Sequence, residues 1–393
     1  MTTPKDYSSI RPIDYADSVR YTKIMKPFGN ATASLTTSRD LEFHLMRTDF
    51  MDGHNVKLAF KAEADDDAAS DDVFMSNIKC IWSTLSVKVG NQYAHNIFNY
   101  GHLSCILDNI YMSAQERTGR AAIAQGIPAL SASGTAVKYS HDILRDGVLD
   151  NVLPLYKLPQ VIIKFELDSN VAAYTNATTA VGSVDVTDVK LIIPQFRSAK
   201  LRAKMDSGDY QIVYTDWDEF SNTALLSGAS SHSLVIPASH KSVTGIIIHP
   251  RNIADINDPD WGGEKYQACS VFNALSKLYL TIDGQPVPAE PIDCTNGVEL
   301  YDYLLEFAGG QHGSFFTGAY DTATDGQFIL ALPLSSEPFD RNVVSGLDLN
   351  SKTGQIIVEF SSMTASVNTH IRGWVRYQRI MQISKDGKAF FAK

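Results

Sequence analysis

The sequence predicts an all-β protein made of two tandem eight-stranded jelly-roll sandwiches, each with a short flanking helix. Three observations support this prediction. Stretches of the first half recur in the second half at a nearly constant offset. Apolar residues fall in short alternating runs rich in Val, Ile, Phe and Tyr, which are typical of strands. No strand–helix–strand rhythm recurs along the 393 residues, which argues against a parallel α/β sheet.

The recurring stretches appear in the same order in both halves. STLSVKVGNQYAH starts at Ser83 and SKLYLTIDGQPVP at Ser276, an offset of 193 residues, and QVIIKF at Gln160 matches QIIVEF at Gln355, an offset of 195. An amphipathic helix lies between them in each copy, with the apolar stripe Leu103, Ile106, Leu107 and Ile110 in the first and Leu300, Tyr303, Leu304 and Phe307 in the second. A weaker match pairs VKLAF (56–60) with GIIIHP (245–250). The chain is therefore interpreted as a duplication.

The individual strands of the duplicated unit are short and are separated by Gly, Asn, Asp and Pro turns. The expected strands are Leu41–Met46, Val56–Ala62, Leu85–Val89, Val161–Leu167, Ile246–His249, Leu278–Ile282, Phe328–Leu332, Ile356–Phe360 and Ile371–Ile383. About eight strands in roughly 190 residues, with one helix between them, fit a jelly roll. A sandwich of this kind buries one face of each sheet, as the alternation requires.

The expected organisation has five parts. They are an N-terminal arm (1–33), a first jelly roll (34–193), a connector (194–210), a second jelly roll (211–384) and a C-terminal tail (385–393). In the connector, Pro194 is expected to end a strand and Gln195–Met205 to form a basic helix. Each unit also has one long loop, at 118–140 and 308–326, and the equivalent positions of these loops predict that they emerge at the same end of the molecule.

Charge and composition exclude several classes of protein. A net charge of −10 argues against a protein that coats nucleic acid or binds a specific sequence of it. No apolar run reaches the roughly 20 residues that span a bilayer, and the N-terminus lacks the apolar region of a signal peptide, which predicts folding in a cytosol. The cysteines, expected to be reduced and buried, are Cys80, Cys105, Cys269 and Cys294.

Basic residues nevertheless gather locally. The clusters are Arg197, Lys200, Arg202 and Lys204, then Arg372, Arg376 and Arg379, then Lys385, Lys388 and Lys393. One interpretation is that they lie on solvated strand and helix surfaces. The other is that a chain end faces an anionic structure such as lipid headgroups or packaged DNA.

No catalytic, cofactor-binding or metal-binding residue is predicted. The acidic run Asp65–Asp72 lacks the spacing and the glycine of a calcium loop. Neither Gly309–Ser314 nor residues 227–233 have the strand–GxSxG–helix context of a serine nucleophile. The remaining candidates are the carboxylates of Asp216, Asp218 and Glu219, which could supply a pair for glycoside chemistry if the fold placed them suitably.

Several passages of the chain resemble the double jelly-roll major capsid proteins, the lineage of tectiviruses, adenoviruses, polintons, virophages and large DNA viruses. The second half is similar to polinton-type members in TIDGQPVPAEPI (281–292), ELYDYLLEF (299–307), GQFILALPL (326–334), SGLDL (345–349) and GWVRYQRIMQIS (373–384). In the first half, LSVKVGNQYAHNIFNYGHLSCILDNI (85–110) is similar to the strand–turn–helix passage of the family. The long insertions of adenovirus-like members are missing, so small capsids are the better match.

The resemblance implies a structural protein of the virion, not an enzyme and without a cofactor. It implies a homotrimer of six similar sandwiches, a pseudo-hexameric capsomer that tiles an icosahedral shell. The implied partners are neighbouring capsomers, penton and minor capsid proteins, and an internal membrane reached by the terminal arms. The two long loops are expected to face outward, and assembly is expected in the host cytoplasm or nucleus.

Two alternatives come from other uses of jelly rolls. A glycan-active enzyme would use Asp216, Asp218 or Glu219 as acid and base in a carboxylate-lined groove. A carbohydrate-binding or adhesin protein would line a groove with exposed aromatic side chains, for which Trp217, Trp261 and Tyr266 are the candidates.

Overall fold

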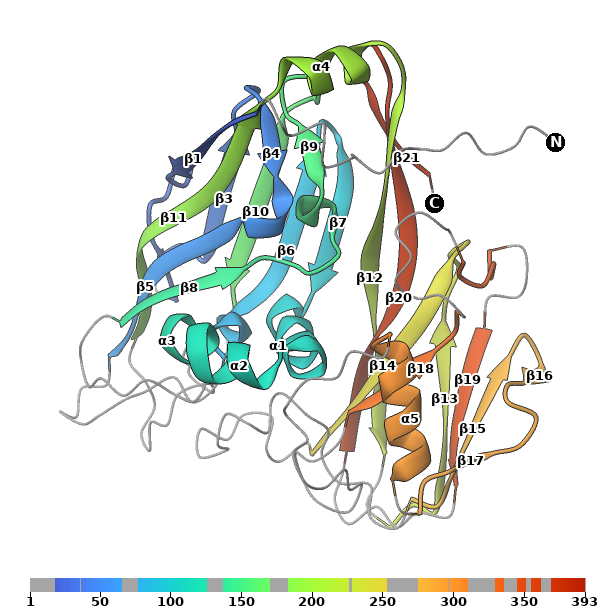
Figure 1. The fold of residues 1–393 in the computed structure, drawn as a ribbon. Coiled ribbons are helices and arrows are strands. Elements are labelled where there is room, and N and C mark those ends of the chain that lie inside the picture. Colours follow the sequence, from blue (N-terminus) through green and yellow to red (C-terminus); the bar gives the residue numbers. More distant parts are fainter. Residues whose placement is uncertain are drawn as a thin grey trace.

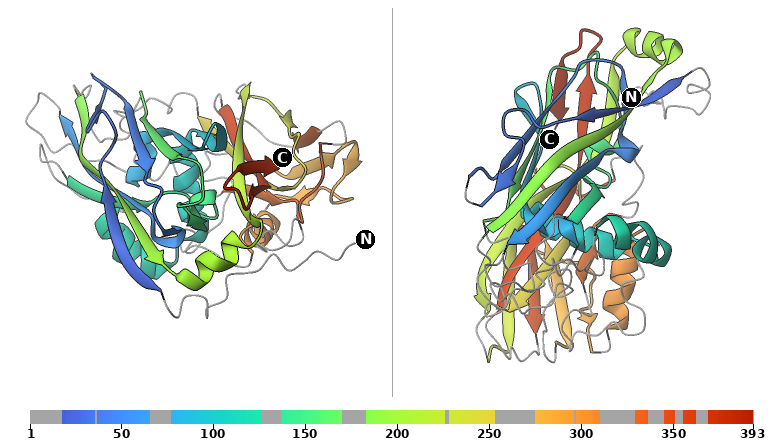
Figure 2. Two further views of the ribbon diagram at one scale, coloured as in Figure 1. Left: turned by 90° about the horizontal axis from the view of Figure 1, so that it is seen from above. Right: turned by 90° about the vertical axis from the view of Figure 1, so that its left-hand side faces the viewer.

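The computed structural model describes most of the chain. The described residues are 18–35, 37–65, 77–125, 137–169, 183–225, 228–252, 275–295, 297–309, 329–335, 345–350, 355–361 and 369–392. Two antiparallel β-sandwiches stand side by side (Figure 1), and helix α4 (Ala199–Asp206) joins them at one end. The view from above in Figure 2 shows the same arrangement.

Among the described residues, the first sandwich has a seven-stranded and a four-stranded sheet. The larger sheet contains β8 (Val137–Asp142), β5 (Lys57–Asp65), β11 (Ser183–Arg197), β4 (Phe50–Asp52) and β9 (Val152–Pro154), with β1 (Val19–Met25) and β2 (Ala33–Ser34) paired to β11. The smaller sheet has the order β3 (Asp40–Leu45), β10 (Val161–Leu167), β6 (Trp82–Val89) and β7 (Gln92–Phe98).

The second sandwich, in the part of the chain that the structure describes, has two five-stranded sheets. One has the order β12 (Tyr210–Leu225), β20 (Thr369–Ile383), β14 (Val243–Asn252) and β18 (Leu330–Pro333), with β21 (Ala389–Ala392) paired to β20. The other has the order β13 (Ser231–Pro237), β19 (Gln355–Ser361), β15 (Lys277–Ile282) and β16 (Gln285–Pro286), with β17 (Ile292–Asp293) paired to β15.

The same eight-stranded pattern underlies both sandwiches. The order β1-β11-β5-β8 in the first matches β12-β20-β14-β18 in the second, and β3-β10-β6-β7 matches β13-β19-β15-β16. Helices α1 (Tyr100–Tyr111) and α5 (Val298–Phe307) are the two predicted amphipathic helices. Each recurring stretch therefore falls on equivalent elements: β6 with β15, β10 with β19, α1 with α5, and β5 with β14. The predicted fold class is confirmed.

The prediction of an N-terminal arm is wrong for residues 19–25. They form β1, which pairs with β11 from Val19↔Arg197 to Met25↔Leu191 and is the first strand of the first jelly roll. The sequence does not predict this strand because it lies at the edge of the sheet. Only Met25 of its seven residues is buried, so apolar and polar residues do not alternate along it. The first jelly roll thus begins before residue 34, and the other boundary residues stay predictions.

Two details at the chain connections also differ from prediction. Strand β11 continues through Pro194 to Arg197, so α4 starts at Ala199 and not at Gln195. Pro194 is tolerated because it lies in the gap between β5, whose pairing ends at Ile192, and β4, whose pairing starts at Gln195. The expected C-terminal tail contains strand β21, which pairs with β20.

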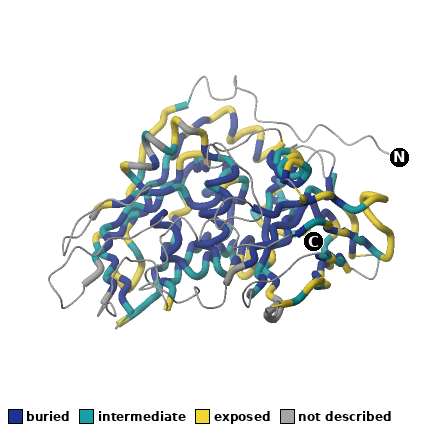
Figure 3. The backbone as a smooth tube through the Cα atoms, turned by 90° about the horizontal axis from the view of Figure 1, so that it is seen from below, coloured by how far each residue is buried: buried dark blue, intermediate teal, exposed yellow. Residues whose placement is uncertain are grey.

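Helix α1 closes one end of the first core, because its predicted apolar stripe is fully buried. It packs against the short helix η3 (Ile78–Ile81), and a Cβ on Gly101 would lie 2.4 Å from the Lys79 carbonyl oxygen, so only glycine allows this approach. The short helices α2 (Ala114–Glu116), η4 (Arg117–Ala121) and α3 (Ala122–Ala124) follow. Buried residues fill the middle of both sandwiches (Figure 3).

Candidate functional site: the seam between the two jelly rolls

The sheet β12-β20-β14-β18 is packed on both faces, and this packing joins the two units. Trp217, Ile247 and Trp374 belong to the apolar core of the first unit. Their neighbours Ile246, Ile248 and Val375 belong to the core of the second unit. Both faces of a strand buried on two sides must be apolar, which explains the continuous run GIII in β14. We call this contact, which β7 and α1 make with β12 and β20, the seam.

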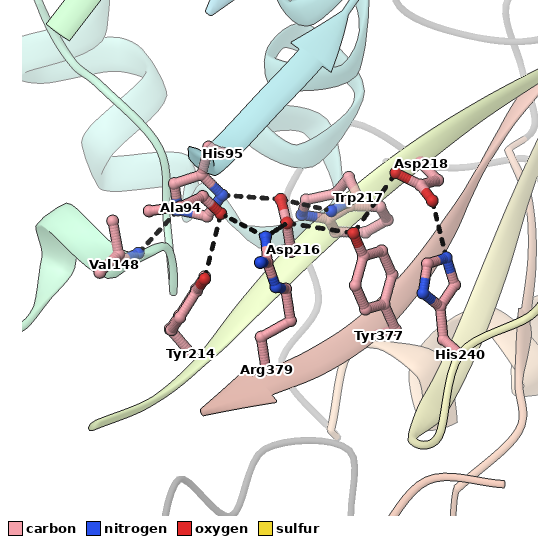
Figure 4. A network of polar contacts seen from close by, with 10 residues as sticks. All are labelled: Ala94, His95, Val148, Tyr214, Asp216, Trp217, Asp218, His240, Tyr377 and Arg379. Atoms are coloured by element: carbon pink, nitrogen blue, oxygen red, sulfur yellow. Dashed lines mark hydrogen bonds and ion pairs between the residues drawn. The ribbon is translucent and has the colours of Figure 1, made fainter. Parts of the chain in front are cut away.

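The centre of the seam is a buried charged network (Figure 4). His95 on β7 and Asp216 on β12 are 1% and 2% exposed, and Nδ1 of His95 lies 2.7 Å from Oδ1 of Asp216. The other ring nitrogen, Nε2, accepts a hydrogen bond of 2.8 Å from the Val148 N–H. His95 therefore carries its proton on Nδ1 and donates it to Asp216.

Arg379 on β20 completes the network. Its Nη1 donates to Oδ2 of Asp216 at 2.8 Å and to the Ala94 carbonyl at 2.9 Å, so one guanidinium holds both units. The Tyr214 hydroxyl donates to the same carbonyl at 3.1 Å. Burial alone would raise the pKa of the Asp216 carboxyl, but His95 and Arg379 outweigh it and hold that pKa below its ordinary value. Asp216 is thus a fixed anion.

The network continues to the surface through Tyr377 and Asp218. The Tyr377 hydroxyl lies 3.1 Å from Oδ2 of Asp216 and 3.3 Å from Oδ1 of Asp218. Nε2 of His240 lies 2.7 Å from Oδ2 of Asp218, and its ring stacks on Tyr377 at 3.6 Å between centroids. The Asp218 side chain is 52% exposed, so the charge at this end is solvated.

A second polar cluster ties the start of α1 to the second unit. Asn99 precedes α1 in a left-handed conformation and donates to Oε1 of Glu219 at 2.7 Å. Arg372 donates to Oδ1 of Asn99 at 2.8 Å, and its Nε lies 3.1 Å from Oε1 of Glu219. The indole N–H of Trp374 reaches the Phe98 carbonyl at 3.4 Å. These contacts fix the angle between α1 and the sheet β12-β20.

Arg376 joins the ends of the two equivalent helices. Its Nη1 donates to the hydroxyl of Tyr111, the last residue of α1, at 3.3 Å and to the carbonyl of Phe307, the last residue of α5, at 3.2 Å. The guanidinium also lies 3.9 Å from the centroid of the Phe307 ring, and Nε donates to Oγ1 of Thr244 at 3.0 Å. Burial lowers the pKa of Arg376 below its usual value.

The seam tests the enzyme alternative. An open groove of 810 Å³ runs beside it and is lined by Asp216, Asp218 and Glu219 together with Tyr93 and Phe98. A glycosidase needs one carboxyl with a raised pKa as its acid. Here the pKa of Asp216 is lowered, and Glu219 is held by Arg372 and Asn99. The arrangement therefore supports structure and does not support acid–base catalysis.

The structure also argues against the carbohydrate-binding alternative at Trp217, the one candidate aromatic residue that is described. Trp217 was expected to be exposed but is only 3% exposed, because its side chain packs in the core of the first unit. Trp261 and Tyr266 lie outside the described residues. Of the two predicted loops, 118–140 is described only at its ends and 308–326 only at residues 308 and 309.

The other candidates from the sequence have no role at the seam. Of Asp65–Asp72 only Asp65 is described, and of Gly309–Ser314 only Gly309. Residues 228–233 lead into strand β13, not into a strand–helix turn. Cys80, Cys105 and Cys294 are buried free thiols, as predicted, and Cys269 lies outside the described residues.

Among the described residues, no group of three or more His, Cys, Asp or Glu side chains is placed to hold a metal ion. None of the helices in this part of the chain is long and apolar enough to cross a membrane.

Sequence reasoning missed the residues that matter most at the seam, His95, Arg376 and Arg379. The two arginines were attributed to a solvated basic face or to an anion-facing chain end. A signal was present, since RYQRIMQIS places charged residues on a strand otherwise rich in large apolar and aromatic residues. Charges are buried at such positions only when they are paired or fully hydrogen-bonded.

No protein-family model matches the chain, and no curated protein matches it in sequence. In structure, the chain is similar to a chain of the PBCV-1 virus capsid, with a TM-score of 0.69 and 10% identity over 96% of this chain and 97% of that one. It is similar to the Faustovirus major capsid protein (TM-score 0.65, 9% identity, 95% and 91% covered). It is also similar to a chain of the Sputnik virophage (TM-score 0.61, 12% identity, 96% and 88% covered).

These likenesses show the fold. The chain has, over nearly its whole length, the double jelly-roll fold of these capsid chains. In fold, the resemblance found in the sequence is confirmed.

Proposed function

We propose that this protein is a viral major capsid protein that assembles as a homotrimer. The observation that carries the proposal is that two equivalent jelly rolls stand side by side as one body, fixed by a buried seam, over nearly the full length of known capsid chains. Three such chains place six similar sandwiches around one axis. That pseudo-hexameric capsomer can tile an icosahedral shell, in which neighbouring capsomers, penton proteins and minor capsid proteins are the partners.

Exposed apolar side chains support contacts between copies. Val19 and Ile24 on the edge strand β1, and Phe28 just after it, are 68%, 62% and 66% exposed. An edge strand with apolar side chains is a liability in a monomer and is normally covered by a partner. Stable interfaces between capsid subunits are large and apolar, so this edge is suited to a subunit contact.

The proposal is tested by the mass and shape of the purified particle. We expect light scattering to give about 130 kDa, three times the chain mass of 43.2 kDa, and negative-stain images to show hexagonal outlines or closed shells. A uniform 43 kDa monomer at micromolar concentration would overturn the proposal.

The distribution of charge supports one orientation of the chain in the shell. Helix α4 lies at one end of the molecule, and α5 lies toward the other end (Figure 1, Figure 2). Lys200, Arg202 and Lys204 on α4 are exposed. Lys385 and Lys388 are exposed at the same end, where the Lys385 N–H bonds to Asp209 just after α4. We propose that this basic end faces the interior of the shell and lies on anionic lipid, whereas the opposite end faces outward.

This orientation predicts binding to anionic vesicles. The protein is expected to co-sediment with vesicles of phosphatidylglycerol at low salt, because each exposed basic residue contributes about 1 kcal/mol near an anionic surface. Lys200→Glu with Lys204→Glu should weaken that binding at least tenfold. Neutral phosphatidylcholine vesicles are the control. Equal binding of the variant and the unmodified protein would place the lipid contact elsewhere.

A further inference from the structure

A second cavity lies beside helix α1 of the first unit, away from the groove at the seam. It has a volume of 490 Å³, within the range of roughly 300–1,000 Å³ typical of small-molecule sites. Residues of helix α1, the short helices α2 and η4, the end of β8, and the short helices η2 (Gly53–Asn55) and η5 (Val148–Asp150) surround it. We call it the helix-side cavity.

The charge of the cavity wall is strongly negative. Its carboxylates are Asp108, Glu116, Asp142, Asp146 and Asp150, and its basic side chains are His54, Lys79 and Arg145. Nζ of Lys79 lies 2.8 Å from Oδ2 of Asp108, and Nδ1 of His54 lies 3.0 Å from Oδ1 of Asp150, so Asp108 and Asp150 are already paired and three carboxylates face one remaining cation. The guanidinium of Arg145 lies 5.1 Å from the centroid of the Tyr111 ring. An anionic ligand is therefore disfavoured, and a cationic one is favoured.

An independent feature points to a ligand with hydrogen-bond donors. Gln125, the residue after α3, is 1% exposed and lines the cavity. Its main chain is satisfied, since its N–H bonds to the Ala121 carbonyl and its carbonyl accepts from the Ile78 N–H. Among the described residues, however, the buried side-chain oxygen Oε1 has no hydrogen-bond partner. A buried acceptor without a donor costs stability unless a bound molecule supplies one.

The rest of the cavity wall is apolar, which favours a ligand that has aliphatic parts as well as positive charge. Leu107, Ile143, Leu144 and Leu149 line the cavity between the carboxylates. A wall that alternates carboxylates with aliphatic side chains suits ammonium groups joined by methylene chains. A bare metal ion suits it less, because the described carboxylates form no cluster with metal-ligand geometry.

We propose that the helix-side cavity binds an aliphatic polyamine. One ammonium group donates to Oε1 of Gln125, a second lies beside the carboxylates of Asp142 and Asp146, and the methylene chain covers the leucines. The proposal rests on the cavity alone and does not depend on the capsid role.

Spermidine titrated into the purified full-length protein, followed by calorimetry, tests the proposal. We expect saturable binding of one molecule per chain. Gln125→Leu should weaken binding about tenfold while leaving the melting temperature unchanged or higher, because it removes a buried acceptor that lacks a donor. Asp146→Asn should also weaken binding about tenfold, and asparagine tolerates the left-handed backbone (φ 58°) at this position.

The matched control is Glu359→Gln, which removes one exposed carboxylate on β19 in the second unit and should leave binding unchanged. Three outcomes would overturn the proposal. They are the absence of saturable binding, equal affinity of Gln125→Leu and the unmodified protein, and displacement of spermidine by magnesium chloride at equal concentration.

Discussion

Replacing Asp216 by asparagine is expected to lower the free energy of unfolding by about 3 kcal/mol at pH 7. The substitution keeps the shape of the side chain and removes its charge. Arg379, whose side chain is 11% exposed, then stays buried without a carboxylate, and the single amide oxygen of asparagine can accept from His95 or from Arg379 but not from both. Breaking a buried pair by removing one partner is costly because the other charge stays out of water. Urea unfolding followed by tryptophan fluorescence measures the change.

The same substitution should change how stability depends on pH. The pKa of Asp216 is lower in the folded protein than its ordinary value of about 3.9 in an unfolded chain. Such a group stabilises the fold above the unfolded pKa, and this contribution is lost as the pH falls through the folded pKa. The gap in unfolding free energy between the unmodified protein and Asp216→Asn should therefore be full at pH 7 and pH 5 and should shrink below about pH 4.

Asp218→Asn is the matched control, because it makes the same change two residues further along β12. The Asp218 side chain is 52% exposed, so its loss should cost less than about 1 kcal/mol. Combining Asp216→Asn with Arg379→Met should recover part of the loss, since both buried charges are then gone. If Asp216→Asn costs no more than Asp218→Asn, the network does not hold the seam together.

The fold could be predicted from the sequence because the duplication made weak signals reinforce one another. A single run such as QVIIKF fits many strands, but its partner QIIVEF at an offset of 195 residues restricts it to one place in a repeated unit. Strand β10 was placed with both ends correct, since its burial alternates along its whole length. Helices α1 and α5 were found by their apolar stripes for the same reason.

The edge strands and the seam escaped prediction for physical reasons. Among the described residues, strand β1 pairs only with β11 and exposes most of its side chains, so its sequence shows no alternation of buried and exposed residues. The seam joins residues far apart in the chain, His95 and Asp216 being 121 positions apart. The sequence could nominate Asp216 as a carboxylate of interest. It could not show that a histidine and an arginine from two other strands neutralise it.

The seam explains how a duplicated chain can act as one building block. Two jelly rolls joined only by α4 would be free to change their relative angle. Burial of Trp217 and Trp374 in the core of the first unit, together with directional bonds to Asp216, Glu219 and Arg376, leaves a single relative orientation. A trimer of six sandwiches with regular spacing requires that rigidity, because an error in the angle within one chain would be repeated around the ring.

Replacing Arg376 by alanine is expected to lower the free energy of unfolding by about 4 kcal/mol and to separate the unfolding of the two jelly rolls. Arg376 is 3% exposed, and its guanidinium donates to the carbonyls of Thr244 and Phe307 and to the Tyr111 hydroxyl. Alanine leaves these buried acceptors without their donor, at about 1–3 kcal/mol each before relaxation, and opens a cavity on the Phe307 ring. Tyr111 is the last residue of α1 and Phe307 the last residue of α5, so the hydrogen bonds that are lost are those that join the two units.

Differential scanning calorimetry distinguishes this effect from a general loss of stability. The unmodified protein should unfold in one transition, whereas Arg376→Ala should show two, because each sandwich keeps its own core but loses part of the coupling between them. Arg376→Lys should also destabilise, since an ammonium cannot reproduce the planar set of donors. Lys200→Ala, on the exposed face of α4, is the control and should shift the free energy of unfolding by less than about 0.5 kcal/mol. A single transition for Arg376→Ala at the temperature of the unmodified protein would show that this arginine does not couple the two units.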